Sequence, residues 1–389
     1  MPWLNRRSLC LLAALTAPAG ALTPLGAVGD EDSNRWPSTE VIGQWIDQLG
    51  ASSYRSRRAS QRRLLELSGS STTQADRVRD LLLASKFPTG DLELDLAKQR
   101  LVSAIDQQQA ELRMDQFLHD PRFDKRSVTG WEQFARFAGS DLDARLVFAA
   151  ILDQHPSFGH VIAGRVTTPS EQTDAPAAPS AAPSAAPDIT TWFAALAMAC
   201  QQVGERVDEQ TMHMVSMLRS PGAGPEPSRE HERQVCKSLV GSYLSRAPID
   251  ARDRLVIAAR YGCKQIVESE CRRVLSDPSE SPSRLVTALL AASATELDEH
   301  ELRQWTARYR HDPRVSHVWR SMVPPKTTRR TQVRDVALAV ELHRSGIDPR
   351  ERGYDALEAD PILVFRPYSL GFESESERAK THAPESALR

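Results

Sequence analysis

The densest group of side chains that could do chemistry is a basic run near the start of the helical sequence. It contains Arg55, Arg57, Arg58, Arg62 and Arg63. A helix would spread the run over more than one face, but it would bring Arg58 and Arg62 together at i, i+4. Arg55, Arg58 and Arg62 are therefore candidate contacts for an anion or polyanion, such as an acidic polysaccharide or lipid head groups. The alternative is a solvated surface whose arginines pair with acids of neighbouring repeats.

The four cysteines that follow position 21 are Cys200, Cys236, Cys263 and Cys271. An even number permits disulfides in an exported chain, with three pairings. One continuous helix would hold Cys263 and Cys271 about 12 Å apart, which is too far to bond. All four also lie in or beside apolar helical patterns, where a free cysteine acts as a small hydrophobe. If a disulfide forms, Cys200 with Cys236 is the pair with the least against it.

Motifs for catalysis and for cofactors are missing from the sequence. It has no Gly-x-x-x-x-Gly-Lys-Ser/Thr loop, no Gly-rich dinucleotide turn, no Gly-x-Ser-x-Gly elbow and no Cys-x-x-Cys. His155 and His160 flank a turn, but Zn²⁺ usually needs three or four ligands, and ordinary loop histidines are the better interpretation. We therefore predict no catalytic residue, no cofactor and no metal site, although residues far apart in sequence can still assemble a triad.

The first 21 residues have the order of a secretory leader. Two arginines precede the apolar run 9–15, and Ala19 and Ala21 supply small residues at the −3 and −1 positions of a cleavage site. A membrane-spanning helix needs about 20 apolar residues, so no run in the chain is long enough. We expect cleavage after residue 21, a flexible start over 22–35, and a periplasmic or secreted protein. An uncleaved anchor is the alternative.

The overall charge argues against a nucleic-acid partner. The chain has 49 Lys and Arg residues against 51 Asp and Glu residues, a formal net charge of −2. A chain with this balance has no basic field over its whole surface that would attract nucleic acid or anionic lipid.

Helical periodicity dominates the rest of the chain, which is rich in Ala, Leu and Arg, all strong helix formers. Caps and apolar spacing predict helices over 38–49, 53–68, 73–85, 91–119, 130–138, 141–154, 189–204, 208–218, 229–245, 250–261, 264–276, 282–293, 298–310 and 331–345. The one short β-like run is 360–367, which we expect to pack as an irregular segment. The sequence thus predicts an all-α fold.

Residues 168–188 interrupt the helical pattern. Prolines recur every four residues in a Pro-Ser-Ala-Ala unit, and each removes a backbone donor. This composition predicts a semi-rigid Pro/Ala linker between an N-terminal helical lobe, 36–167, and a C-terminal helical lobe, 189–371. The polar residues 372–389 are expected to form a flexible tail.

A six-residue phrase recurs along the chain. Arg145-Leu-Val-Phe-Ala-Ala is echoed at Arg254 and Arg284, and Arg334 opens a looser copy. Helical hairpins that repeat in this way must stack to bury their apolar faces. If the phrase marks a buried helix, Leu255, Ile257 and Ala258 should be inaccessible, and Arg254 should reach an acid or a carbonyl. The irregular spacing makes the repeats degenerate, and chance similarity among Ala/Leu-rich helices is the alternative.

These short Ala-rich helical hairpins, with an arginine opening the second helix, resemble HEAT-like repeats. Residues 45–50, 254–262 and 331–339 are more narrowly similar to a group of exported bacterial HEAT-like proteins of unassigned activity. The resemblance covers roughly 36–110 and 229–373. It implies two α-solenoid lobes of degenerate helical hairpins, and it implies no catalytic residues.

These features favour a non-enzymatic binding or scaffold protein that offers helical surfaces to a protein partner in the cell envelope or outside the cell. The alternative is an enzyme or enzyme subunit, such as a hydrolase, with dispersed residues in a groove between the lobes. A structural component of an envelope assembly is a third interpretation. An exposed apolar or charged stripe would support binding, whereas buried Asp, His and Arg in a closed pocket would support catalysis.

Overall fold

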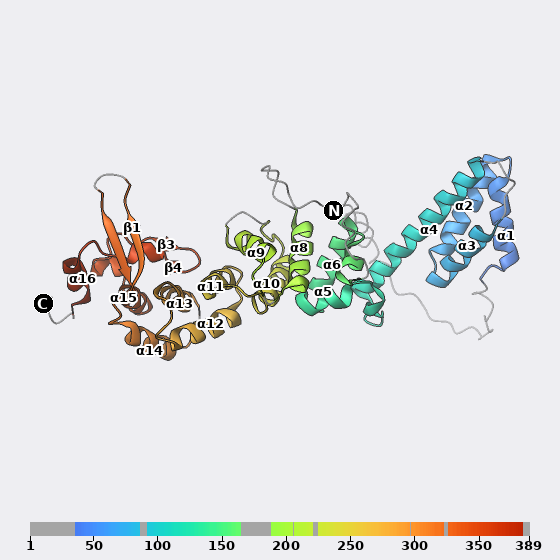
Figure 1. Ribbon diagram of the computed structural model, residues 1–389. Coiled ribbons are helices and arrows are strands. Elements are labelled where there is room, and N and C mark those ends of the chain that lie inside the picture. Colours follow the sequence, from blue (N-terminus) through green and yellow to red (C-terminus); the bar gives the residue numbers. More distant parts are fainter. Residues whose placement is uncertain are drawn as a thin grey trace, which may run out of the picture. The chain divides into compact units, whose positions relative to one another are not determined.

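The computed structural model describes residues 36–85, 92–164, 188–204, 206–220, 225–295, 297–322 and 326–383. Helices make up 68% of these residues and strands 5%, so the fold is mostly helical, as predicted (Figure 1). Every predicted helical range holds a helix whose ends lie within two residues of those expected. The expected leader, the segment 22–35 and the linker residues 168–187 lie outside the described residues.

The chain divides into two compact units between Glu111 and Leu112. Unit 1 contains α1 (Thr39–Asp47), η1 (Gln48–Gly50), α2 (Tyr54–Ser68), α3 (Thr72–Ala84) and most of α4 (Leu92–His119). Its small core is aliphatic and consists of Ile42, Ile46, Leu49, Leu64, Leu67, Ala75, Val78, Leu82, Leu94, Leu101 and Ile105. Ser38 and Ser71 cap α1 and α3 by accepting hydrogen bonds from main-chain N–H groups of the first turn.

Unit 2 takes the end of α4 and the rest of the described chain. Its first elements are η2 (Lys125–Ser127), α5 (Trp131–Ala138), α6 (Leu142–Gln154), α7 (Phe158–Ile162), α8 (Ile189–Gln202), α9 (Glu209–Arg219) and α10 (Glu230–Leu244). The next are α11 (Ala251–Arg260), α12 (Lys264–Ser276), α13 (Pro282–Ala294), α14 (Glu299–Tyr309) and α15 (Val333–Arg344). One continuous hydrophobic core runs through these helices.

The predicted boundary between two lobes at 168–188 needs correction. Helices α5, α6 and α7, which precede this segment, pack against α8, and α5 and α6 also pack against α10. They therefore belong to the core of unit 2, and the boundary lies within α4. Asp188, the last residue of the expected linker, is the N-cap of α8. The Pro/Ala composition therefore marks a connection between α7 and α8, which pack against each other. The apolar faces of the helices before and after this connection are buried in one core.

An aromatic cluster explains why α5 and α6 do not form a lobe with unit 1. Phe117, Trp131, Phe134, Phe148 and Phe158 pack edge-to-face or tilted, with centroid distances from 5.0 to 6.4 Å. Such pairs contribute about 0.5–1.5 kcal/mol each beyond the area that they bury. Phe117 lies near the end of α4, so the cluster fixes that end of the helix in unit 2.

The recurring phrase lies on helices that pack together. Arg254 and Arg284 stand within the first four residues of α11 and α13, and α12 packs against both helices. Leu255, Ile257 and Ala258 are fully buried, as predicted. Arg254 reaches both kinds of partner expected: Nη2 donates to Ala247 O at 2.9 Å, and Nη1 lies 3.5 Å from Glu270 Oε2.

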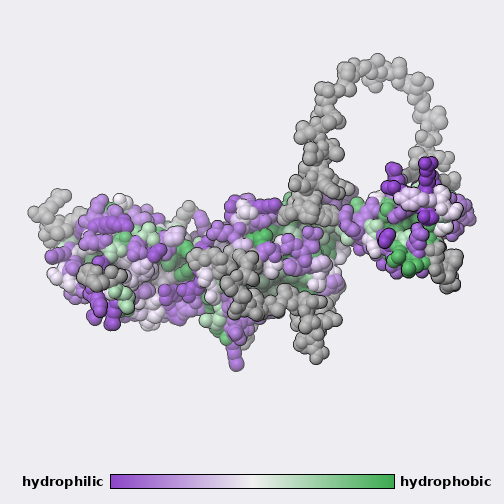
Figure 2. Space-filling view, turned by 90° about the horizontal axis from the view of Figure 1, so that it is seen from above, coloured by the Kyte–Doolittle hydropathy of each residue, from purple (hydrophilic) through white to green (hydrophobic). Residues whose placement is uncertain are grey.

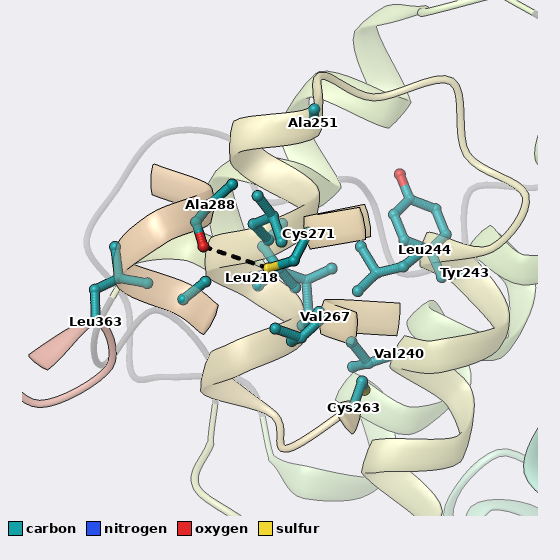
Figure 3. Close-up of a cluster of buried hydrophobic side chains, with 14 of the residues drawn as sticks. Leu218, Val240, Tyr243, Leu244, Ala251, Cys263, Val267, Cys271, Ala288 and Leu363 are labelled. Carbon is teal, nitrogen blue, oxygen red and sulfur yellow. Dashed lines mark hydrogen bonds between the residues drawn. The ribbon is translucent and has the colours of Figure 1, made fainter. Parts of the chain in front are cut away.

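Figure 3 shows buried side chains of α10, α12 and α13 packed in one cluster. The side chain of Cys271 on α12 points toward α13, and its thiol donates to Ala288 O at 3.4 Å. Val267, one turn earlier on α12, and Val240 on α10 are buried in the same cluster.

The end of unit 2 carries the strands. Its elements are β1 (Val315–Arg320), β2 (Thr328–Gln332), η3 (Pro349–Arg352), β3 (Ala359–Asp360), β4 (Val364–Phe365), η4 (Pro367–Leu370) and α16 (Glu375–His382). β1 pairs antiparallel with β2, and β3 pairs antiparallel with β4. The run 360–367 thus contributes to a short hairpin in place of the expected irregular segment.

Two features of this region correct the sequence analysis. The β1–β2 hairpin was not predicted, because its second strand, Thr-Arg-Arg-Thr-Gln, has no apolar alternation. The predicted flexible tail 372–389 is wrong over its described part. Residues 375–382 form α16, on which Arg378 and Thr381 are buried.

Candidate functional site

The predicted anion contact lies on the solvent-exposed surface of α2. Arg55, Arg58 and Arg62 are all exposed. Arg58 donates to the Tyr54 hydroxyl at 3.4 Å, and Arg62 Nε lies 2.7 Å from Glu66 Oε1. An exposed pair of this kind contributes only about 0.3–0.5 kcal/mol. The anion contact therefore stays a prediction, with part of its charge already balanced by Glu66.

The four described cysteines are buried free thiols. Cys200 donates its thiol to Leu239 O on α10 at 3.3 Å. Burial raises the pKa of both the Cys200 and the Cys236 thiol to about 12, so neither supplies a reactive thiolate near neutral pH. The Cys200–Cys236 disulfide considered from the sequence is not formed in this structure. The two residues act as small core side chains on α8 and α10.

The histidines weighed as metal ligands take separate roles. His155 Nε2 lies 3.1 Å from Thr191 Oγ1 and so links the end of α6 to the start of α8, while His160 is exposed on α7. Among the described residues, no three or more His, Cys, Asp or Glu side chains are grouped so that they could hold a metal ion.

A buried ion pair at the end of the chain escaped the sequence analysis. Asp335 on α15 is 0% exposed and Arg378 on α16 is 3% exposed. Arg378 Nε lies 2.9 Å from Asp335 Oδ1, and His382 Nε2 lies 3.2 Å from the same oxygen. Gln332 N donates to Asp335 Oδ2 at 2.8 Å. Both carboxylate oxygens are thus occupied by neighbouring donors.

Further hydrogen bonds bind this pair into the fold. Arg378 Nη2 donates to Arg330 O on β2 at 2.7 Å. The Tyr354 hydroxyl donates to Asp335 O at 2.6 Å, and burial raises the pKa of Tyr354 well above its ordinary value. The ion pair therefore fastens α16 to both α15 and the base of the β1–β2 hairpin.

Exposed apolar side chains gather on that hairpin. Val318, Trp319 and Met322 are 55%, 40% and 88% exposed, and Val315 is 42% exposed. Single exposed apolar residues are common on protein surfaces, but four within eight consecutive residues form a patch that calls for a partner. In the view of Figure 2, much of the described surface is hydrophilic and hydrophobic residues show as smaller areas between.

The hairpin is also basic. The sequence between Asp312 and Asp335 contains Arg and Lys but neither Asp nor Glu. Arg314 pairs with Asp312, Arg329 with Glu373 and Arg334 with Glu375. A second group is exposed and forms no ion pair with any described residue: Arg320, Lys326 and Arg330.

The strand register distributes these side chains over two faces. Val318 stands opposite Arg330, whereas Trp319 stands opposite Arg329. Successive residues of a strand point to opposite faces, so the exposed Val318 and Trp319 lie on different faces of the hairpin. Met322 follows the end of β1.

The base of the hairpin is held firmly. Arg330 and Phe372 exchange two main-chain hydrogen bonds, of 3.0 and 3.3 Å. Thr331 Oγ1 donates to Pro367 O at 3.0 Å. The strands then extend away from α13 and α15 (Figure 1). Within the described residues, the sheet contains only β1 and β2, so the outer edge of β1 has no neighbouring strand.

We name this surface the hairpin patch and define it as Val318, Trp319, Arg320, Met322, Lys326 and Arg330.

Comparison of the chain with protein-family models, curated proteins and solved structures finds no match. None of the helices in the described ranges is long and apolar enough to cross a membrane.

Proposed function

We propose that this chain is an exported, non-enzymatic binding or scaffold protein built from degenerate HEAT-like helical hairpins, and that it contacts the cell envelope through the hairpin patch. The patch carries the proposal because it combines exposed apolar side chains with cations that have no acidic partner among the described residues. Exposed apolar groups are costly in water, and a chain that keeps them on a firmly held hairpin gains when a partner covers them.

The packing of unit 2 supports the repeat part of this proposal. The pairs α10–α11 and α12–α13 are consecutive packed helical hairpins, and α11 also packs against α13. Arg254 and Arg284 lie near the start of the second helix in each pair. Stacked hairpins with equivalent residues at equivalent positions are typical of solenoids.

The enzyme alternative has one feature in its favour, the buried group of Asp335, Arg378 and His382. A carboxylate that acts as a general base must come within hydrogen-bond reach of the substrate, and Asp335 is 0% exposed. Both oxygens of Asp335 already accept hydrogen bonds from within the fold. We therefore favour a structural role for this group, as the clamp that holds α16 and the hairpin base.

Capture from the envelope fraction tests the proposal. The full chain should retain envelope components, and a variant with Trp319→Ser and Met322→Ser should lose most of them because it removes two of the three exposed apolar side chains of the patch. The matched control carries Val207→Ser and Met212→Ser, which change two residues exposed to 51% and 59% outside the hairpin. Equal capture by the hairpin variant and the control would overturn the role of the patch.

A further inference from the structure

We infer that the hairpin patch docks on an anionic lipid surface. This inference rests on the proposed function, because it names the chemistry of the partner that the patch binds. Its basis is a local one: the whole chain has a net charge of −2, yet the segment between Asp312 and Asp335 carries no acid. Salt screens charges that are farther apart than a Debye length, so a charged surface that touches the hairpin responds mainly to the electrostatic potential of the hairpin.

The distribution of the apolar groups distinguishes a membrane interface from a docked protein. Val318 and Trp319 lie on opposite faces of the hairpin, and Met322 lies beyond the end of β1. A protein that packed against one face would leave the apolar side chain of the other face in water. A lipid interface surrounds an inserted hairpin from all sides, and so it buries Val318, Trp319 and Met322 together.

The residue types fit the same environment. Tryptophan is favoured at membrane–water interfaces, because its ring is apolar and its N–H can still meet polar head groups. Arg320 follows Trp319 directly, and Lys326 and Arg330 lie on the returning segment. Long cationic side chains can extend from an inserted backbone to anionic head groups.

The acids nearest in sequence do not oppose this docking. Asp312 is paired with Arg314, and Asp335 is buried in its ion pair with Arg378. Glu373 lies 3.2 Å from Arg329. These carboxylates are therefore neutralised by their arginine partners. Arg320, Lys326 and Arg330, which have no acidic partner in the described part of the chain, are left to face the lipid surface.

Co-sedimentation with vesicles tests the inference. The probes are vesicles of phosphatidylcholine alone and vesicles of phosphatidylcholine with phosphatidylglycerol. Wild type and variants are full chains made in the same way, so that any contribution of residues 1–21 is common to all. We expect binding to the anionic vesicles that weakens with added salt, and little binding to phosphatidylcholine alone.

Charge and apolar variants then locate the site. Each basic residue near an anionic surface contributes enough for about a fivefold change in affinity, so Arg320→Ser with Lys326→Ser should weaken binding about 25-fold. The matched control, Arg113→Ser with Arg136→Ser, also removes two exposed cations and should bind like wild type. Trp319→Phe should remove a blue shift of fluorescence that wild type shows on anionic vesicles. Circular dichroism verifies that each variant is folded.

Each outcome decides the inference. Binding that is equal on both vesicle types, absent on both, or lost in the Arg113 and Arg136 control overturns the docking by the hairpin. If vesicles do not bind but an envelope protein is captured through the patch, the lipid inference fails and the proposed function stands. In that case the captured protein would bind as an acidic segment that adds a strand to the edge of β1, which has no neighbouring strand among the described residues.

Discussion

Three arginines of unit 1 and three of unit 2 have different roles. In unit 1, Arg55, Arg58 and Arg62 lie exposed on α2. In unit 2, arginines donate to carbonyls at the ends of other helices. Arg145 Nη1 donates to Phe117 O and Leu118 O at 2.8 and 2.6 Å, Arg246 to Cys200 O at 2.7 Å, and Arg260 to Arg219 O at 2.8 Å.

This difference shows that position relative to a neighbouring helix end, and not composition, decides what an arginine does. The last carbonyls of a helix have no partner within the helix, and they carry the negative end of its dipole. A guanidinium that reaches them supplies both donors and positive charge. In unit 2 these arginines therefore join one helix to the next, whereas Arg55, Arg58 and Arg62 on α2 stay exposed to water.

The largest effect should come from the most deeply buried arginine. Arg378→Met leaves the Asp335 carboxylate buried without its counter-ion, which should cost about 3–5 kcal/mol of unfolding free energy. Hydrogen exchange followed by mass spectrometry should show α16 opening in the variant. Adding Asp335→Asn should recover part of the loss, because the stranded charge is gone. If the Arg378→Met variant is as stable as wild type, the ion pair between Arg378 and Asp335 does not hold α16 in place.

The next effect separates the two cores. Leu255 in unit 2 and Leu64 in unit 1 are both fully buried. Each Leu→Ala substitution should cost about 2–5 kcal/mol, but in its own unit alone. Hydrogen exchange should rise across α11–α13 for Leu255→Ala, with α1–α3 unchanged, and the reverse for Leu64→Ala. Equal loosening of both units by either variant would show that the two cores are one cooperative structure.

The arginine comparison itself can be tested with two matched substitutions. Arg145→Met removes two charge-assisted hydrogen bonds to the end of α4 and should cost about 1.5–3 kcal/mol. Arg55→Met removes an exposed arginine of the same size and should change stability by no more than about 0.5 kcal/mol. Chemical unfolding of both variants measures the difference. Similar losses would mean that the helix-end contacts contribute little.

The smallest effect is a change of stability with pH that is confined to acid, at the start of α8. Burial opposes ionisation of Asp188, but hydrogen bonds from Thr190 and Thr191 outweigh it and lower the pKa from 3.8 to about 2. A carboxylate whose pKa is depressed by folding stabilises the fold above its unfolded pKa, and this contribution is lost as pH falls from about 4 through 2. The stability difference between wild type and Asp188→Ala should shrink over this window. If the stability difference between wild type and Asp188→Ala does not change with pH, the Asp188 carboxylate does not stabilise the start of α8 through its charge.

The helices were predictable because the signals for them are local. Ser281 caps α13 and Pro282 occupies its first turn, and both residues can be recognised in the sequence without knowledge of the fold. Apolar residues at helical spacing then gave the buried faces, including Ala251, Leu255 and Ala258 on α11. Compositional breaks also located the connections between helices. These features require only residues within a turn or two of each other.

Partners distant in sequence were decided by the tertiary structure alone. Arg378 meets Asp335, and Arg145 meets the end of α4, through contacts that no local pattern encodes. The hairpin patch could not be found for the same reason: β2 is polar, and only its pairing with β1 and Phe372 holds it extended. The basic half of the patch lies in a stretch of sequence without acids, which we did not identify from the sequence, and its exposure depended on the fold.

Val364 shows the limit of local preference most directly. Its φ of 66° lies in the left-handed region, which a β-branched residue strongly disfavours. Asp360 Oδ1 accepts hydrogen bonds from Ile362 N and Leu363 N at 2.8 and 2.9 Å and so shapes the turn before it. The sequence by itself determined where helices begin and end, because capping and periodicity act over a few residues. The tertiary structure determined which helices share a core, which arginines are buried and where the chain is strained, because those depend on groups brought together only by folding.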